Sequence, residues 1–172
     1  MTFSVAIPTC LRKYATFGGR AVRSEYWWFV VFLVLGSVIL AIVDGMLFGT
    51  TTVETAPGVI AVQSNGPLAA LFSLAAFVPA LSAGWRRMHD TGRSGLYLLY
   101  PLIVMIGLGG AVSFFGDIGA LQGGTAAGLA AIVLIPSMII LFLSPLLVLW
   151  WLTRPSQPGQ NAYGPNSQEV TP

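Results

Sequence analysis

The residues that could do chemistry are few, and most lie in two short segments. The chain holds one histidine and one cysteine in 172 residues. The histidine, His89, stands beside Asp90 within the segment Trp85–Gly95. A catalytic or metal-binding His-Asp pair needs further ligands that converge on it, and no second histidine exists to supply one. We therefore expect a structural role for His89, with pH sensing or ligand contact as the alternative, and we expect no catalytic residue, metal or cofactor.

Five arginines lie in this segment and in an earlier one, Tyr14–Phe29. They are Arg20, Arg23, Arg86, Arg87 and Arg93. Guanidinium groups bind phosphate through paired hydrogen bonds, so these side chains predict an anion site for phospholipid headgroups. Two nearby carboxylates, Glu25 and Asp90, support a second interpretation. In that interpretation Glu25, His89 and Asp90 join the arginines in a structural network that fixes how helix ends pack. The two interpretations are compatible, because the arginines outnumber the carboxylates.

A third candidate is Asp44, which stands near the end of an otherwise apolar run. A carboxylate inside hydrocarbon is costly and often functional. Asp44 either reaches water at the outer membrane face or forms an intramembrane ionisable site that binds a proton or cation. The second reading would suit a small oligomeric transporter or channel.

The composition predicts an integral membrane protein. Hydrophobic residues make up 55% of the chain and charged residues only 8%, whereas soluble domains average roughly 25% charged residues. Eight basic residues and a net charge of +2 are too few for a phosphate-binding surface on nucleic acid. Phosphate-loop and G-x-S-x-G motifs are absent from the sequence, so we expect a protein that is not an enzyme.

Four apolar runs approach or exceed the roughly 20 helical residues that cross a bilayer core. They cover residues 27–48, 67–85, 96–115 and 129–152. The predicted fold is all-α, a compact bundle of four transmembrane helices. Prolines fall inside three of these runs, where they remove backbone hydrogen bonds and favour kinks.

The basic residues predict the orientation of this bundle. All eight fall on one side of a four-span arrangement, which the positive-inside rule makes cytoplasmic. Both termini are then cytoplasmic. On the outer side, residues 50–55 and 59–63 could form a small hairpin or an irregular loop, and residues 116–128 should be a mobile glycine-rich loop. Residues 153–172 should form a flexible cytoplasmic tail.

Three motifs resemble those of a known family. They are an aromatic-x-x-Phe-x-Gly-Arg-x-x-Arg-x-Glu-Tyr-Trp pattern from Tyr14 to Trp27, Arg-Arg-x-His-Asp-x-Gly-Arg-Ser-Gly from Arg86 to Gly95, and Gly-x-Asn-x-Tyr-Gly-Pro from Gly159 to Pro165. Together they resemble the bacterial inner-membrane family DUF805. The resemblance implies one membrane domain over residues 1–165 and a multi-pass protein of the bacterial inner membrane, but no activity.

These observations favour a small non-enzymatic membrane protein. Its cytoplasmic arginine-rich face would bind anionic phospholipids or a protein partner, and a homo-oligomer would be compatible with the sequence. The alternative function is the oligomeric transporter or channel, which would use Asp44 and proline-kinked helices.

Overall fold

The computed structural model describes the backbone of residues 1–122, 124–166 and 168–169. Side chains of residues 112, 114–131, 133 and 134 are outside this description. The elements along the chain are α1 (Phe3–Arg12), α2 (Arg23–Phe48), β1 (Thr50–Ala56), β2 (Val59–Ser64), α3 (Leu68–Asp90), a 3-10 helix η1 (Gly95–Leu99), α4 (Tyr100–Gln122) and α5 (Gly124–Thr153).

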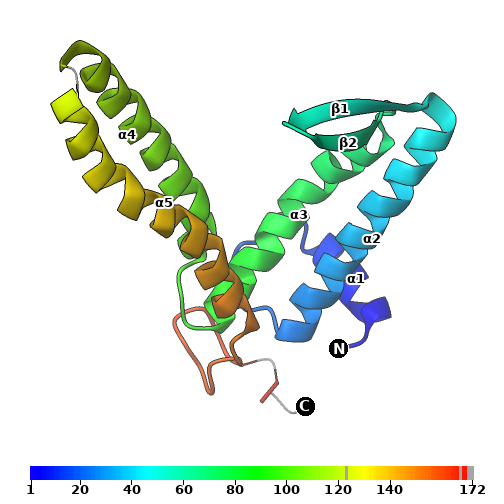
Figure 1. Cartoon of the computed structure of the whole chain (residues 1–172). Helices are drawn as coiled ribbons and strands as arrows, with labels where there is room; N and C mark the ends of the chain where they lie inside the picture. The colour runs from blue at the N-terminus through cyan, green and yellow to red at the C-terminus, as the bar shows by residue number, and fades with distance from the viewer. Residues whose placement is uncertain (123, 167, 170–172) are drawn as a thin grey trace.

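The long helices form two hairpins that diverge from a shared base, where α1, the start of α2 and the ends of α3 and α5 meet (Figure 1). Helix α2 packs along α3, and α4 packs along α5, whereas α3 and α5 contact each other much less. This arrangement differs from the predicted compact bundle. Above the base, large apolar side chains such as Leu74 and Ile106 are exposed. Lipid is as apolar as such side chains, so there is no hydrophobic driving force that brings the two hairpins together there.

Three helical segments are long and apolar enough to cross a membrane: α2, α3 and the Ile135–Thr153 part of α5. The predicted span 96–115 corresponds to η1 and α4. Its described part, Gly95–Ala111, is a shorter apolar helix, and part of the remainder has side chains outside the described residues. The structure therefore supports a mostly helical membrane protein with three such helices, and the fourth span stays a prediction.

Helix α3 ends later than the sequence suggests. The segment Trp85–Gly95 is predicted as a loop, but the helix continues through Asp90, so the turn occupies only residues 91–94. Gly92 ends the helix with φ of 75°, a backbone conformation that glycine adopts without a steric penalty. Arg86, Arg87, His89 and Asp90 thus lie on the last turns of a helix, which fixes their directions.

Of the two connections at the ends of the hairpins away from the base, one confirms an alternative from the sequence and the other contradicts the prediction (Figure 1). Strands β1 and β2 form an antiparallel hairpin that pairs Thr50 with Ser64, so the fold also contains a small sheet. The expected loop 116–128 is wrong, because α4 continues to Gln122 and α5 begins at Gly124. A helix satisfies its own backbone hydrogen bonds, which an apolar environment requires.

Helix α1 was not predicted from the sequence. It packs against α2 through Ala6 and Cys10, which are fully buried, and Phe3 contacts Trp28 edge to face at 5.7 Å. Its other face leaves Val5 and Leu11 exposed. This alternation of buried and exposed apolar side chains is typical of a helix that lies along a membrane surface.

Candidate functional site

The base holds a buried charge cluster, made of Arg20, Glu25, Arg86, Arg87 and Asp90, each at most 7% exposed. Three ion pairs among the described residues join it: Arg20 to Asp90 at 3.0 Å, Arg86 to Glu25, and Arg87 to Asp90. The expected pairing of Glu25 and Asp90 with arginines is confirmed. Buried charges need such partners, because desolvation without compensation costs several kcal/mol per ion.

Asp90 is the centre of this cluster. One carboxylate oxygen accepts from Arg20, and the other accepts from Arg87 and from the hydroxyl of Ser156. Its backbone carbonyl accepts from the amide of Gln157 at 2.8 Å. A single side chain therefore joins the end of α3, the segment before α2 and the segment after α5.

Arg87 and Arg20 also donate hydrogen bonds to backbone carbonyls. Arg87 donates Nε to the carbonyl of Leu152 at 3.0 Å and a terminal nitrogen to the carbonyl of Arg154, which caps the end of α5. Arg20 donates to the carbonyls of Gln157 and Gly159. All three nitrogens of each guanidinium are thus used within the protein.

Glu25 and Arg86 form the second half of the cluster, beneath α1. Arg86 donates to Glu25, but its Nε and second terminal nitrogen have no hydrogen-bond partner among the described residues. The thiol of Cys10 lies 3.9 Å from the Glu25 carboxylate. Burial, with a smaller contribution from the charge of Glu25, raises the pKa of Cys10 to about 11. The thiol is therefore neutral near pH 7 and is not an activated nucleophile.

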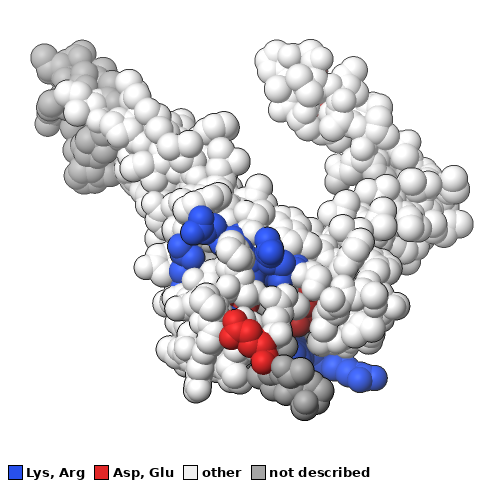
Figure 2. All heavy atoms as spheres, turned by 90° about the horizontal axis from the view of Figure 1, so that it is seen from below, with Lys and Arg blue, Asp and Glu red and all other residues white. Residues whose placement is uncertain are grey.

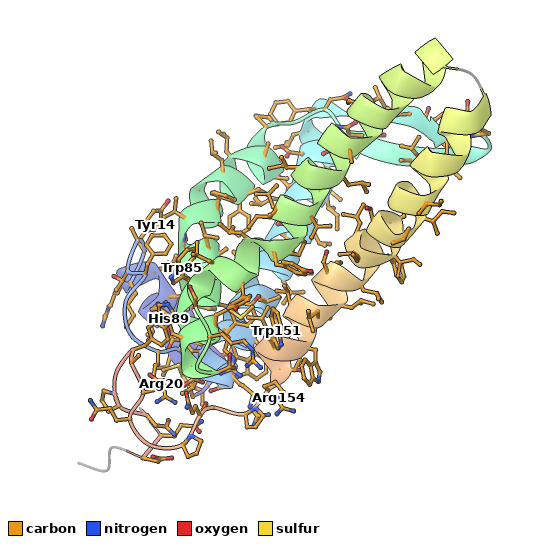
Figure 3. The ribbon with its side chains drawn as sticks, turned by 90° about the vertical axis from the view of Figure 1, so that its left-hand side faces the viewer. Tyr14, Arg20, Trp85, His89, Trp151 and Arg154 are labelled. Carbon is orange, nitrogen blue, oxygen red and sulfur yellow. The ribbon has the colours of Figure 1, made fainter. Side chains whose placement is uncertain are left out.

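The segment after α5 lies against this cluster through His89, which the sequence assigns a structural role. The His89 ring stacks on Tyr163 with centroids 3.7 Å apart, and its backbone carbonyl accepts from Asn161 at 3.0 Å. The Nδ1 atom is 3.1 Å from the carbonyl of Gly19, so Nδ1 is the donor, because a carbonyl only accepts. Figure 3 shows Arg20 and His89 at the foot of α3. The sequence predicts a flexible tail here, whereas the structure places residues 156–164 against α3.

A second set of basic side chains, the arginine rim, consists of Arg23, Arg93 and Arg154. Arg23 and Arg154 are exposed and Arg93 is half-buried. Arg93 lies over the ring of Trp151 at 5.2 Å, and Arg154 lies over Trp150 at 5.0 Å. Within the described residues, no carboxylate is within ion-pair distance of the rim. Seen from below, basic side chains gather at the base, while most of the visible surface is uncharged (Figure 2).

The five arginines predicted as one anion site therefore separate into two environments. Arg20, Arg86 and Arg87 belong to the buried charge cluster, whereas Arg23 and Arg93 belong to the rim. Sequence reasoning left Arg154 out of the site, although Trp150 and Trp151 precede it by four and three residues. The available signal was this short spacing of a cation from two aromatic side chains at the end of an apolar run.

Asp44 lies at the opposite end of the molecule and is fully buried. Its two carboxylate oxygens accept from the backbone amides of Leu68 at 3.0 Å and Ala69 at 2.8 Å. It therefore caps the first turn of α3 from another helix, which satisfies amides that have no partner within α3. Gly66 passes close to this carboxylate, where a Cβ atom would collide with it.

Two prolines inside helices leave carbonyls that other side chains satisfy. Pro79 has no N–H for the carbonyl of Ala75, and the hydroxyl of Tyr14 donates to that carbonyl at 2.6 Å. Pro145 likewise leaves the carbonyl of Leu141, which accepts from Ser144 at 3.0 Å. The helices continue through both prolines, and the contact with Ala75 gives Tyr14 a structural role.

Comparison with known proteins agrees with these observations. A family model described as "Protein of unknown function (DUF805)" matches residues 14–165 and so begins after α1. Inner membrane protein YhaH of Escherichia coli strain K12 is 33% identical over 97 residues, which cover 56% of this chain and 72% of that protein. Inner membrane protein YhaI of the same strain is 32% identical over 97 residues, which cover 56% of this chain and 70% of that protein. No solved structure matches the chain. With its apolar helices and its family match over most of its length, the chain belongs to the DUF805 family of bacterial inner-membrane proteins.

Proposed function

We propose that this protein is a non-enzymatic, four-span inner-membrane protein whose cytoplasmic base binds anionic phospholipid headgroups. The observation that carries the proposal is the arginine rim. Arg93 and Arg154 hold their guanidiniums over tryptophan rings, Arg23 is exposed and near Trp27 in the sequence, and none of the three has a carboxylate partner among the described residues. Each basic side chain near an anionic leaflet contributes about 1 kcal/mol of binding.

The burial of the other arginines sharpens this proposal. Arg20 and Arg87 spend their donors on Asp90 and on backbone carbonyls, and Arg86 is 1% exposed. A phosphate would have to displace internal contacts to reach them. We therefore assign lipid binding to the arginine rim. Arg23 and Arg93 belong to the set predicted from the sequence, and Arg154 is added to it.

The topology is tested with reporter fusions. A reporter active in the cytoplasm should give signal after Thr171, and a reporter active in the periplasm should give signal when inserted near Gly58, in the β1–β2 turn. The physical reason is that all eight basic residues lie on one side of a four-span arrangement. The reverse pattern at either position would reject both the four spans and the cytoplasmic base.

The binding role is tested by mass spectrometry of the detergent-purified protein with its bound lipids. Replacing Arg23, Arg93 and Arg154 with glutamine should abolish the preference for phosphatidylglycerol over phosphatidylcholine. The matched control is Arg12→Gln, which removes an exposed arginine of α1 outside the rim and should leave the preference unchanged. An unchanged preference in the triple variant would reject the proposal, and a co-purified protein or second copy in place of lipid would favour a protein interface.

The transporter alternative gains no support from the position of Asp44. Both of its oxygens accept from backbone amides of α3. These two hydrogen bonds give the carboxylate a structural role, so proton or cation binding is not needed to explain its position.

A further inference from the structure

An apolar groove of about 490 Å³ lies between α4 and α5, close to the base. Its lining includes Tyr100, Ile140, Leu143, Ser144, Leu147 and Trp150. Leu143 and Trp150 are about half exposed, so the groove opens toward the surroundings of the helices. The Ser144 hydroxyl is engaged by the carbonyl of Leu141, which leaves a wall that offers apolar contact rather than free donors.

A second groove of about 300 Å³ adjoins the first. It is lined by Ser94, Leu96, Tyr97, Tyr100 and Ile103. Tyr100 lines both grooves and therefore stands between them. Two neighbouring apolar grooves on helices of a membrane protein fit the two acyl chains of one lipid.

Each groove is connected through a lining aromatic side chain to an arginine that lies over a tryptophan. Trp150 lines the first groove and carries Arg154 at 5.0 Å. Tyr97 lines the second groove and contacts Trp151 edge to face at 5.3 Å, and Trp151 carries Arg93 at 5.2 Å. Figure 3 shows Trp151 and Arg154 together at the foot of α5.

These two arginines keep donors for a ligand. Within the described part of the chain, Arg93 gives one hydrogen bond, to the carbonyl of Thr91 at 3.2 Å. No carboxylate of the described chain pairs with either side chain. An arginine held by an aromatic face keeps its in-plane N–H groups available, and two such groups match the oxygens of a phosphate.

We propose that one anionic diacyl phospholipid binds here, with its phosphate held by Arg93 and Arg154 and its acyl chains in the grooves on either side of Tyr100. This inference rests on the proposed function and adds a defined site to it. A lipid suits the surface better than a soluble phosphate, because both arginines neighbour the lining of an apolar groove: Arg154 lies over Trp150, and Arg93 precedes Ser94 in the chain. Basic pockets between membrane helices at the cytoplasmic side are typical sites for anionic headgroups.

The test uses the full chain in detergent, with dioleoyl phosphatidylglycerol as the probe and bound lipid counted by native mass spectrometry. One variant combines Arg93→Gln and Arg154→Gln, which should weaken binding by roughly thirtyfold for two basic contacts. A second combines Leu147→Trp and Ile103→Trp, which fill the two grooves. The matched control is Leu74→Trp, on the exposed surface of α3. We expect both paired variants to lose the lipid and the control to keep it, and inorganic phosphate not to compete.

The outcomes separate this site from the more general proposal. If the groove-filling variant retains phosphatidylglycerol while the arginine variant loses it, the defined site is rejected and headgroup binding by the rim stands. If the lipid is kept even when all three rim arginines are replaced, both proposals are rejected. Competition by inorganic phosphate, or a second copy bound in place of lipid, would also overturn the site.

Folding of the variants is checked by protection of Cys10, which is buried on the face of α1 that packs against α2, from a thiol reagent. Should the tryptophan pair expose Cys10, the smaller substitutions Leu147→Phe and Ile103→Phe replace it, with Leu74→Phe as the control. Retention of lipid by a folded phenylalanine pair at wild-type level would likewise reject the site.

Discussion

The buried charge cluster and the arginine rim both contain arginines at the base of the molecule, but these arginines have different surroundings. In the cluster, every guanidinium nitrogen of Arg20 and Arg87 donates to Asp90 or to a backbone carbonyl. In the rim, Arg93 and Arg154 rest on tryptophan faces and have no acidic partner among the described residues. The difference teaches that the neighbours of an arginine, rather than its position at the membrane face, decide whether it holds the fold or remains available to a ligand.

Asp90→Asn is the sharpest test of the structural half of this comparison. It removes a carboxylate that serves two buried arginines, Arg20 and Arg87. Leaving buried charge without its partner costs about 3–5 kcal/mol of unfolding free energy. Unfolding can be followed by reaction of a fluorescent thiol reagent with Cys10, the one cysteine of the chain, which is fully buried.

The matched control for this variant is Glu54→Gln, an acid-to-amide change on the exposed strand β1. It should leave the unfolding free energy within about 0.5 kcal/mol of wild type, as most surface substitutions do. Equal effects of the two changes would show that Asp90 does not hold the base together.

Glu25 and Arg86 test whether the cluster works through charge pairing. Glu25→Gln should cost about 3 kcal/mol, because Arg86 then keeps a buried charge without a carboxylate. Arg86 already has two nitrogens without a partner, so replacing the whole pair should be less harmful. We expect the double variant Glu25→Gln, Arg86→Met to recover at least half of the loss, as a double-mutant cycle would measure. A double variant that is worse than the single would contradict this pairing.

The sequence predicted the parts of this molecule that depend on composition and on spacing along the chain. Apolar runs mark α2 and α3 because a membrane helix needs about 20 apolar residues. The β-prone runs around Pro57 and Gly58 gave the β1–β2 hairpin as one of two alternatives, the other being an irregular loop, and the hairpin is the one found. The charges of Glu25 and Asp90 had to find arginines because an unpaired buried charge is unfavourable.

The remainder depends on contacts between distant parts of the chain. The segment after α5 has a composition typical of disorder, yet Ser156 and Gln157 bind Asp90, and no local pattern announces these contacts. In the sequence Asp44 is an isolated charge in an apolar run, because its partners are two backbone amides at the start of α3, distant along the chain. Burial likewise separates Arg87 from Arg93, although both stand in one short motif.

Gly95→Ala compares the base with a helical arm at the level of packing. A Cβ at Gly95 would collide with the ring of Trp85, whereas a Cβ at Gly107 on α4 has no atom of the described chain within 4 Å. Overpacking costs about 1–3 kcal/mol, while a glycine-to-alanine change in an open helical position is neutral or stabilising. The same Cys10 labelling on heating checks both variants. Equal unfolding free energies would mean that the base is no more tightly packed than the arm.

The rim should show the smallest effect on stability, and this absence is what distinguishes it from the cluster. Arg154→Gln removes a cation from the exposed face of Trp150, an interaction worth about 0.5–1 kcal/mol at most in such a place. The backbone carbonyl of Arg154, which accepts from Arg87, stays in place, so the cap of α5 survives the substitution. We therefore expect an unfolding free energy within about 1 kcal/mol of wild type, measured in a detergent free of anionic lipid. If Arg154→Gln lowered the unfolding free energy as much as Asp90→Asn, Arg154 would belong to the buried charge cluster. The rim could then not be treated as a surface available to a ligand.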